Sequence, residues 1–166
     1  MLINCAGYFP FQPFAQVTAD QWRKVIDINL TGTFLMCHAM VPLMTGRGWG
    51  RIVNFGSGSG SVFQGTAGQA HYVAAKAGVV GFSRSLAREV GGEGITVNVI
   101  TPGVTLTKAV TDSFTPEKVK QQQAQRALKR DEQPEDLVGP VFFLASPDAD
   151  FMTGQTVNID GGNYMG

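Results

Sequence analysis

The feature that most constrains the fold is the alternation of short β-branched runs with longer segments of helical periodicity. Residues 95–100 read Ile-Thr-Val-Asn-Val-Ile and are followed by Thr101-Pro102-Gly103, a pattern typical of a strand closed by a turn. Residues 51–55 and 155–159 have the same character, and the apolar residues 2–6 also predict a strand. Because helical segments of at least ten residues separate these strands, the sequence predicts βαβ units and a parallel sheet.

Three helices are predicted between the strands. Thr18-Ala19-Asp20-Gln21 is a capping-box sequence, from which a helix is expected to run to about Met44. Pro134 suits the first turn of a helix ending near Ala145. The helix from about 71 to 90 is predicted from small and apolar residues at spacings of three and four, namely Val73, Ala77, Val80, Ser83, Leu86, Ala87 and Val90. The polar segment 105–130 predicts small helices that cover an opening.

Composition indicates one domain and excludes several classes of partner. With 166 residues, 43% of them hydrophobic, the chain can bury a core. Thirteen basic residues balance thirteen acidic ones, so neither nucleic acid nor an anionic membrane is expected as a partner. Cys5 and Cys37 lie in apolar segments without ligand spacing, which predicts reduced, buried thiols and neither disulfide nor metal site. Residues 1–3 are too short for a signal core, so a cytoplasmic location is expected.

Tyr72 and Lys76 stand four residues apart at the start of the predicted helix 71–90. Side chains at i and i+4 share a helix face, so the ammonium can approach the phenol. A close cation lowers a phenol pKa from about 10, and a shift of ~3 units would require ~4 kcal/mol. The cation, a helix N-terminus and a bound cationic group could supply this together, giving a proton donor. An amphipathic helix with an incidental tyrosine and a solvated lysine has the same local sequence.

Two further polar side chains are candidates for the same site. Ser57 follows strand 51–55, and ligands of open parallel sheets bind at the carboxyl ends of strands. Its hydroxyl could bond a substrate carbonyl or alcohol, although an ordinary Ser/Gly turn is the alternative. Asn29 lies within the predicted helix ending near Met44, where asparagine offers the backbone another hydrogen bond. The alternative is an ordinary asparagine on the helix surface.

These motifs together resemble the short-chain dehydrogenase/reductase family. Asn4-Cys5-Ala6-Gly7 is similar to the family's NNAG turn, with Cys5 as a departure at the second position. The family's catalytic Asn, Ser, Tyr and Lys have counterparts in the same order at Asn29, within 57–59, at Tyr72 and at Lys76.

The resemblance extends over almost the whole chain. Residues 98–103 with Thr107 are similar to the family's NxxxPGxxxT segment, and residues 153–162 resemble its C-terminal strand. The subfamily of closest resemblance is that of 3-oxoacyl-(acyl-carrier-protein) reductases. The implied fold is α/β, the C-terminal part of a Rossmann-type doubly wound parallel sheet with flanking helices, in one N-terminally incomplete domain spanning 1–166.

The resemblance implies an NAD(P)-dependent oxidoreductase that transfers hydride between a nicotinamide and a small-molecule carbonyl or alcohol. Tyr72 would exchange a proton with the substrate oxygen, and Ser57 would orient the carbonyl. Lys76 would lower the Tyr72 pKa and hold the ribose hydroxyls of the nicotinamide, and Asn29 would hold a water in a relay through Lys76. Asn4, Ala6 and Gly7 would line the cofactor groove with Tyr72 and Lys76, and the residues near the carboxamide would be Pro102, Gly103 and Thr107.

Several points stay open. Two serines are candidates for the family's catalytic serine. The family's usual thirteen-residue spacing to the tyrosine selects Ser59, whereas the position at the strand end selects Ser57. Ser57 is preferred because Asn54 anchors the strand end, whereas the length of a loop can vary. His71 is expected only to flank the site, and no role is expected for His38.

Cofactor choice and activity are open as well. The family's TGxxxGxG segment does not precede Met1, so NAD and NADP cannot be told apart, nor can the substrate be identified. A homo-oligomer, dimer or tetramer, is expected. The competing hypothesis is a catalytically impaired, truncated member that acts as an interaction protein through its Asn29 and Tyr72 helices.

Overall fold

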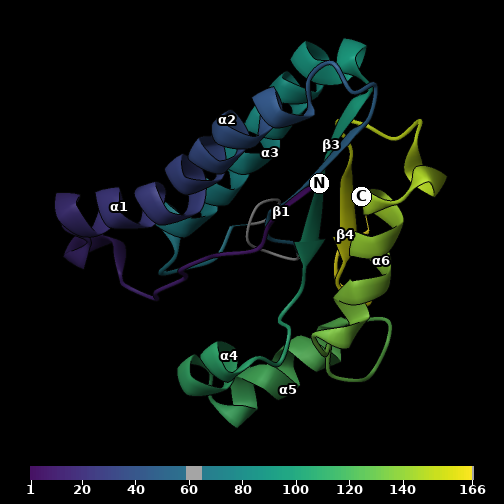
Figure 1. Ribbon diagram of the computed structural model, residues 1–166. Coiled ribbons are helices and arrows are strands. Elements are labelled where there is room, and N and C mark those ends of the chain that lie inside the picture. The colour runs from purple at the N-terminus through teal and green to yellow at the C-terminus, as the bar shows by residue number, and fades with distance from the viewer. Residues whose placement is uncertain (59–64, 166) are drawn as a thin grey trace.

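The computed structural model describes residues 1–58 and 65–165, which form a three-layered α/β fold (Figure 1). Within these residues, four strands make one parallel sheet in the order β1-β2-β3-β4. Their bounds are Leu2–Asn4 (β1), Gly50–Phe55 (β2), Ile95–Pro102 (β3) and Thr156–Ile159 (β4). The predicted parallel sheet is confirmed, although β1 is two residues shorter than predicted.

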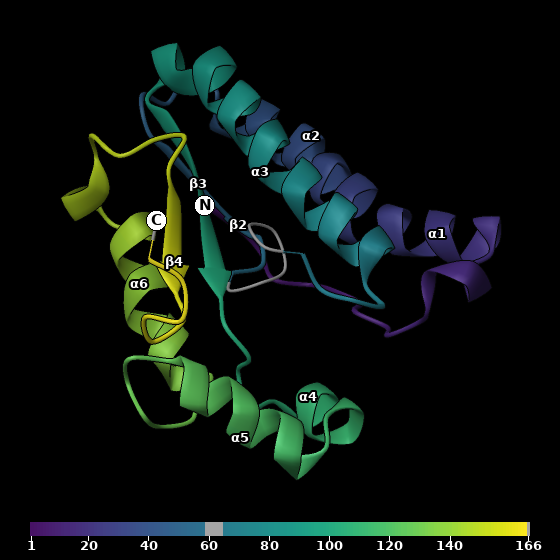
Figure 2. The same ribbon diagram turned by 180° about the vertical axis from the view of Figure 1, so that it is seen from behind.

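Helices cover both faces of the sheet. On one face lie α2 (Gly32–Met44) and the long α3 (Ala70–Val90), while α6 (Glu135–Ala145) covers the other; α1 (Ala19–Ile26) extends beyond the sheet and packs on α3 (Figures 1 and 2). A π-helical turn, Asp27–Thr31, joins α1 to α2 without a break. Short 3-10 turns lie at Phe14–Gln16, Gly91–Glu93 and Pro147–Ala149. The predicted doubly wound arrangement is therefore confirmed.

Strand alternation divides the core into two parts. Ile52 and Val97 point toward α2 and α3, where they pack with Leu2, Met44 and Val90. Val53 and Ile100, on the opposite face of the same strands, pack against Leu144 of α6 and Ala149. The prediction of which α3 residues pack against the core is only partly correct. Ala77, which the prediction includes, is exposed, whereas Ala75 and Val79, which it does not include, are buried.

Local sequence signals explain where the elements begin and turn. The capping box of α1 is formed, since the Thr18 hydroxyl accepts from the Gln21 amide and the Gln21 side chain accepts from the Thr18 amide. Gly94 turns the chain from α3 into β3 with a φ of 71°. A Cβ at this position would lie 2.2 Å from the Gly48 carbonyl oxygen, so the close approach requires glycine.

A small helical subdomain lies beyond the carboxyl ends of the strands. The chain leaves β3 and forms α4 (Lys108–Ser113) and α5 (Pro116–Gln125), which lie apart from the sheet in both ribbon views (Figures 1 and 2). Thr107 and Thr115 cap the two helices with their hydroxyl oxygens. The predicted small helices of segment 105–130 are therefore confirmed, and they stand over the edge at which parallel sheets bind ligands.

The stretch Ala19–Met44 is long and apolar enough to cross a membrane by length and composition. The core helices of soluble proteins pass the same test, and this stretch packs with α3 on the sheet. Its outward side carries the exposed side chains of Phe34, Leu35, Met36 and Leu43. This apolar surface is a candidate for contact with another protein chain.

Candidate active site

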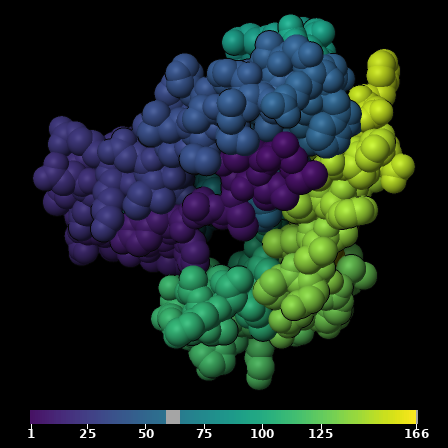
Figure 3. Space-filling view, viewed as in Figure 1, coloured from purple at the N-terminus to yellow at the C-terminus, as the bar shows by residue number. Residues whose placement is uncertain are grey.

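Tyr72 and Ser57 meet at the carboxyl end of β2. Tyr72 lies in the first turn of α3, and Ser57 is the second residue beyond β2, where their side chains hydrogen-bond to each other. Both line a cavity of about 1270 Å³ that extends along the strand ends toward α4 and α5. In the space-filling view, a hollow separates the N-terminal segment from the subdomain of α4 and α5 (Figure 3). Two hydroxyls that share a hydrogen bond can together hold one carbonyl or alcohol oxygen.

Lys76 lies one helical turn after Tyr72, as the spacing predicted, and is only 3% exposed. Its ammonium donates to the Phe55 carbonyl oxygen at 2.8 Å and stands 5.9 Å from the centre of the Tyr72 ring. Burial lowers the pKa of Lys76 from 10.5 to about 8, although the nearby Cys5 acts in the opposite direction. The site thus holds a lysine that gives up its proton at a lower pH than an exposed lysine does.

The pKa of Tyr72 differs from the sequence-based prediction. Burial raises the pKa of the phenol above 10, and the hydrogen bond with Ser57 lowers it only in part. The predicted lowering by Lys76 is therefore wrong for the protein alone. The physical reason is that withdrawal of the phenolate from water is the largest influence on this pKa, and only the hydrogen bond with Ser57 acts against it.

Asn29 lies in the π-helical turn and is completely buried. Its amide nitrogen donates to the carbonyl oxygens of Tyr8 and Val25 at 2.8 and 2.9 Å, and its Oδ1 accepts from the Tyr8 amide at 3.1 Å. A Cβ on Gly7 would lie 3.3 Å from Asn29 Oδ1 and 3.7 Å from Lys76 Nζ, so these three residues converge. The alternative of an ordinary surface asparagine is wrong.

The predicted cofactor residues divide into two groups. Pro102, Gly103 and Thr107 line the cavity beyond the end of β3. Ala6 and Gly7 follow β1 and are exposed beside it. The Asn4 side chain instead turns inward, donating to Asn54 Oδ1 at 2.8 Å, while the Asn54 amide donates to the Ser83 hydroxyl at 2.8 Å. This chain of polar contacts fixes the end of β1 against β2 and α3.

A buried ion pair anchors the segment that carries α4 and α5. Arg126 and Glu132, 3% and 6% exposed, approach to 3.4 Å, and Arg126 also donates to the Val104 carbonyl at 2.8 Å. The Thr105 hydroxyl donates to Glu132 at 2.6 Å. Burial raises the pKa of the Glu132 carboxyl, although Thr105 and Arg126 act in the opposite direction. Both ends of the segment are thereby held together beside Gly103.

The cysteine prediction is half correct. Cys37 is buried, and burial raises its pKa. Cys5 is exposed and lines the cavity, so the prediction of a buried thiol is wrong there. The reason is that β1 ends at Asn4, which leaves Cys5 beyond the edge of the packed core.

Sequence reasoning missed the aromatic residues of the cavity. Phe9 and Phe11, on the loop after β1, and Phe114, at the end of α4, all line it. The signal available was the density of aromatic residues from Tyr8 to Phe14, which predicted only a loop.

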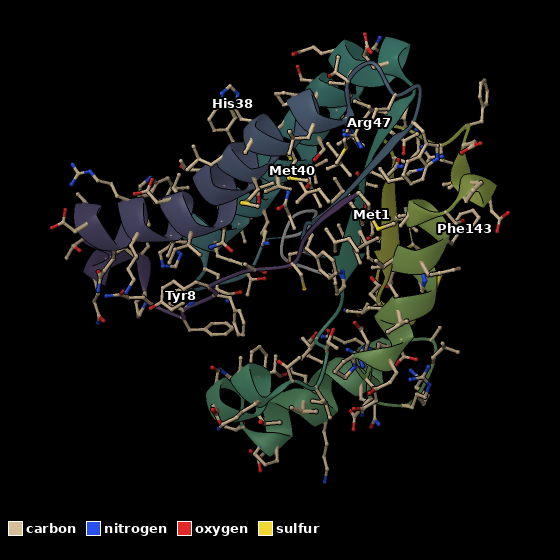
Figure 4. The ribbon with its side chains drawn as sticks, viewed as in Figure 1. Met1, Tyr8, His38, Met40, Arg47 and Phe143 are labelled. Atoms are coloured by element: carbon tan, nitrogen blue, oxygen red, sulfur yellow. The ribbon has the colours of Figure 1, made fainter. Side chains whose placement is uncertain are left out.

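The two histidines lie outside the chemistry of the site. His71 is fully buried, and its Nδ1 accepts from the Tyr72 amide at 2.9 Å, so it flanks Tyr72 as predicted. His38 stacks on Phe34 on the outward side of α2, where Figure 4 labels it. Ser59, the alternative to Ser57, lies outside the described residues.

Comparison with known proteins identifies the family of this chain. A family model described as enoyl-(acyl carrier protein) reductase matches residues 1–163. The chain belongs to the short-chain dehydrogenase/reductase family. Among curated members of the family, it is 39% identical over 168 residues to 3-oxoacyl-(acyl-carrier-protein) reductase FabG of Vibrio cholerae, covering 99% of this chain and 66% of that protein. It is 43% identical over 167 residues to the acetoacetyl-CoA reductase of Rhizobium meliloti, covering 99% and 68%.

Solved structures of short-chain dehydrogenases/reductases are similar over the same region. A 3-oxoacyl-(acyl-carrier protein) reductase from Brucella melitensis with bound NAD aligns with a TM-score of 0.88 and 34% identity, covering 99% of this chain and 62% of that one. A putative gluconate dehydrogenase from Agrobacterium tumefaciens aligns with a TM-score of 0.92 and 33% identity, covering 98% and 64%. The chain thus spans about two thirds of the length of the relatives it matches.

The described residues fit the nicotinamide half of a dinucleotide. An ammonium has three N–H donors, and the Phe55 carbonyl takes one from Lys76, so donors remain for vicinal hydroxyls. Gly7, which has no side chain, leaves the approach to Lys76 and Asn29 open. The chemistry of these donors and the shape of this groove match what a ribose and a flat pyridine ring need.

Proposed function

We propose that this protein is a soluble, cytoplasmic, NAD(P)-dependent oxidoreductase that interconverts a small-molecule ketone and the corresponding alcohol. The observation that carries the proposal is the hydrogen-bonded pair Tyr72–Ser57, with the buried Lys76 one turn away, at the strand ends of a short-chain dehydrogenase/reductase fold. A merely structural protein has no physical need to bury a lysine in this position, because the buried charge destabilises it.

In the reducing direction, a bound nicotinamide cofactor would supply the hydride, a proton with two electrons, that the carbonyl carbon accepts. Ser57 and Tyr72 donate hydrogen bonds to the carbonyl oxygen and polarise the C=O bond. As the C=O π bond breaks, Tyr72 transfers its phenolic proton to the oxygen and the alcohol forms. The raised pKa of Tyr72 keeps the phenol protonated beforehand, so it is available as the acid.

Lys76 has two parts in this proposal. Its remaining N–H donors would bind the ribose hydroxyls, and its ammonium would stabilise the phenolate left on Tyr72 after proton transfer. Asn29 would support the relay that returns a proton, because it fixes the Tyr8 loop and Gly7 beside Lys76. Ala6, Gly7, Pro102, Gly103 and Thr107 would complete the cofactor groove, and Asn4 would support it from below by fixing the end of β1.

Association between copies of the chain belongs to the same proposal. The apolar outward side of α2, with Phe34, Leu35 and Leu43 exposed, supports a homo-oligomer built through this helix. The second candidate function, an interaction protein without catalysis, draws on the same surface but gives no role to the Tyr72–Ser57–Lys76 arrangement.

The test is a tracer experiment on the full-length protein. NADH or NADPH deuterated at C4 of the nicotinamide is incubated with ketones, and the alcohol is analysed by mass spectrometry. Deuterium on the carbinol carbon, lost in Tyr72→Phe, is the expected result. Binding of the cofactor without any transfer to the tested ketones would favour the interaction protein.

A further inference from the structure

Three aromatic side chains line the cavity from the loop after β1 and from the end of α4. Phe9 meets the ring of Tyr72 edge-on, with 6.3 Å between ring centres. Phe11 meets Phe114 in the same geometry at 5.3 Å, so the loop after β1 contacts the end of α4. We call Phe9, Phe11 and Phe114 the aromatic wall. It extends from the tyrosine of the proposed reaction to the helical subdomain.

The loop that carries the wall is held in place at both ends. Asn29 bonds both the amide and the carbonyl of Tyr8, which Figure 4 labels on this loop. Further along, the Gln12 amide donates to the Gly68 carbonyl at 2.7 Å, and the Gln69 side chain donates to the Phe9 carbonyl at 3.3 Å. The backbone that carries Phe9 and Phe11 is therefore ordered before a ligand binds, so binding does not include the entropy loss of ordering this loop.

The subdomain of α4 and α5 meets the loop after β1 in this part of the cavity. Phe114 lies against Phe11, and the Lys118 ammonium stands 5.2 Å from the centre of the Phe11 ring. Val110 adds an aliphatic surface to the same part of the cavity. Aromatic faces and edges bind flat or compact apolar groups through edge-to-face contact.

The charged side chains that line the cavity further limit the chemical class of the ligand. Among its described lining residues, Lys118 is the one charged side chain, and no carboxylate is present. Neutral polar side chains such as Thr66, Gln69 and Gln121 also line the cavity, but a hydroxylated group placed against the aromatic wall would exchange hydrogen bonds with water for phenyl rings, which disfavours it there. An apolar group has no hydrogen bonds with water to lose, and its transfer from water to the wall is favourable in free energy.

We infer that the substrate is a ketone with an aryl or compact apolar group next to the carbonyl. The wall holds this group, and the carbonyl oxygen lies between Tyr72 and Ser57. The inference rests on the proposed function, of which it names the substrate class. Phe11 and Phe114 act as specificity-determining residues because they close the apolar region between loop and subdomain.

The experiment compares matched ketones on the full-length protein. Acetophenone represents the aryl class, acetone the small ketones and dihydroxyacetone the polyhydroxylated ones. For the wild type, kcat/KM is expected to be highest with acetophenone. Phe11→Ala with Phe114→Ala should reduce kcat/KM for acetophenone roughly tenfold or more, as expected for deleted pocket contacts, and change that for acetone little. Phe14→Ala is the matched control, since Phe14 lies on the same loop, is 77% exposed and is not among the cavity residues.

A second readout does not depend on turnover. Saturation-transfer NMR should show acetophenone bound to the wild type and to Phe14→Ala, and its signal lost in the double variant. If the protein reduces acetone but neither prefers nor binds acetophenone, the inference is wrong while hydride transfer stands. If acetophenone binds in a wall-dependent manner but no ketone is reduced, the wall is right and the proposed function fails. Preference for dihydroxyacetone would overturn the inference directly.

Discussion

Replacing Lys76 by methionine should change how the stability of the protein depends on pH. Lys76 is 3% exposed, and burial lowers its pKa from 10.5 to about 8. Between these two values the unfolded chain still holds the proton that the folded protein has released. Unfolding therefore takes up a proton, and the stability of the wild type rises with pH across this window.

The magnitude follows from the same two values. At ~1.4 kcal/mol for each pH unit, the interval from about 8 to 10.5 corresponds to about 3 kcal/mol. Below pH 8 the buried ammonium destabilises the wild type by this free energy, whereas Lys76→Met has no charge to bury. The variant also loses the donor to the Phe55 carbonyl, which costs about 1–3 kcal/mol at every pH. The stability difference at neutral pH is therefore small, and its change with pH is the informative quantity.

The assay is urea unfolding of wild type and Lys76→Met at pH 7, 8, 9 and 10. We expect the wild type to gain about 2–3 kcal/mol relative to the variant between pH 7 and pH 10. Lys120→Met serves as the control because Lys120 is exposed, and it should follow the wild type at each pH. Parallel curves for wild type and Lys76→Met would refute the reasoning, since they would mean that Lys76 keeps its ordinary pKa.

Three other predictions follow from the structure. Ser57→Ala should lower carbonyl reduction at least about 100-fold and Ser59→Ala only slightly, measured as kcat; the reverse order would mean that Ser59 is the serine beside the substrate. Asn29→Ala should reduce the unfolding free energy by about 1–3 kcal/mol in thermal denaturation, because the Tyr8 amide and carbonyl each lose their hydrogen bond to Asn29; an unchanged melting temperature would contradict this. A polypeptide of residues 1–166 should self-associate through the open edge of β1, and Ile3→Lys should reduce association in light scattering; equal scattering by both would argue against the edge.

Much of the fold could be predicted because local signals agreed with the tertiary structure. The capping box at Thr18 and the β-branched run 95–100 identify their elements without knowledge of their neighbours. The spacing of Tyr72 and Lys76 likewise sufficed to place the two side chains on one helix face. Such features depend on interactions within a few residues, which a single sequence displays directly.

The remaining features depend on contacts between distant segments. Asn29 is buried because a π-helical turn and the Tyr8 loop close around it, and nothing in its own helix indicates this. Cys5 is exposed because β1 stops one residue earlier. The rise in the Tyr72 pKa reflects burial, which sequence spacing does not measure. The contact between Phe11 and Phe114 joins residues more than one hundred positions apart.

The most direct test of the central claim is a single-turnover measurement on Tyr72→Phe in the full-length protein. This change removes the phenolic proton and leaves the ring, so NAD(P)H binding measured by fluorescence should stay within a few-fold of the wild type. Hydride transfer to the ketone, followed by the loss of NAD(P)H absorbance, should be slower by roughly 100- to 10,000-fold, as expected for the loss of a positioned general acid. Transfer within a few-fold of the wild-type rate would contradict the assignment of Tyr72 as the proton donor.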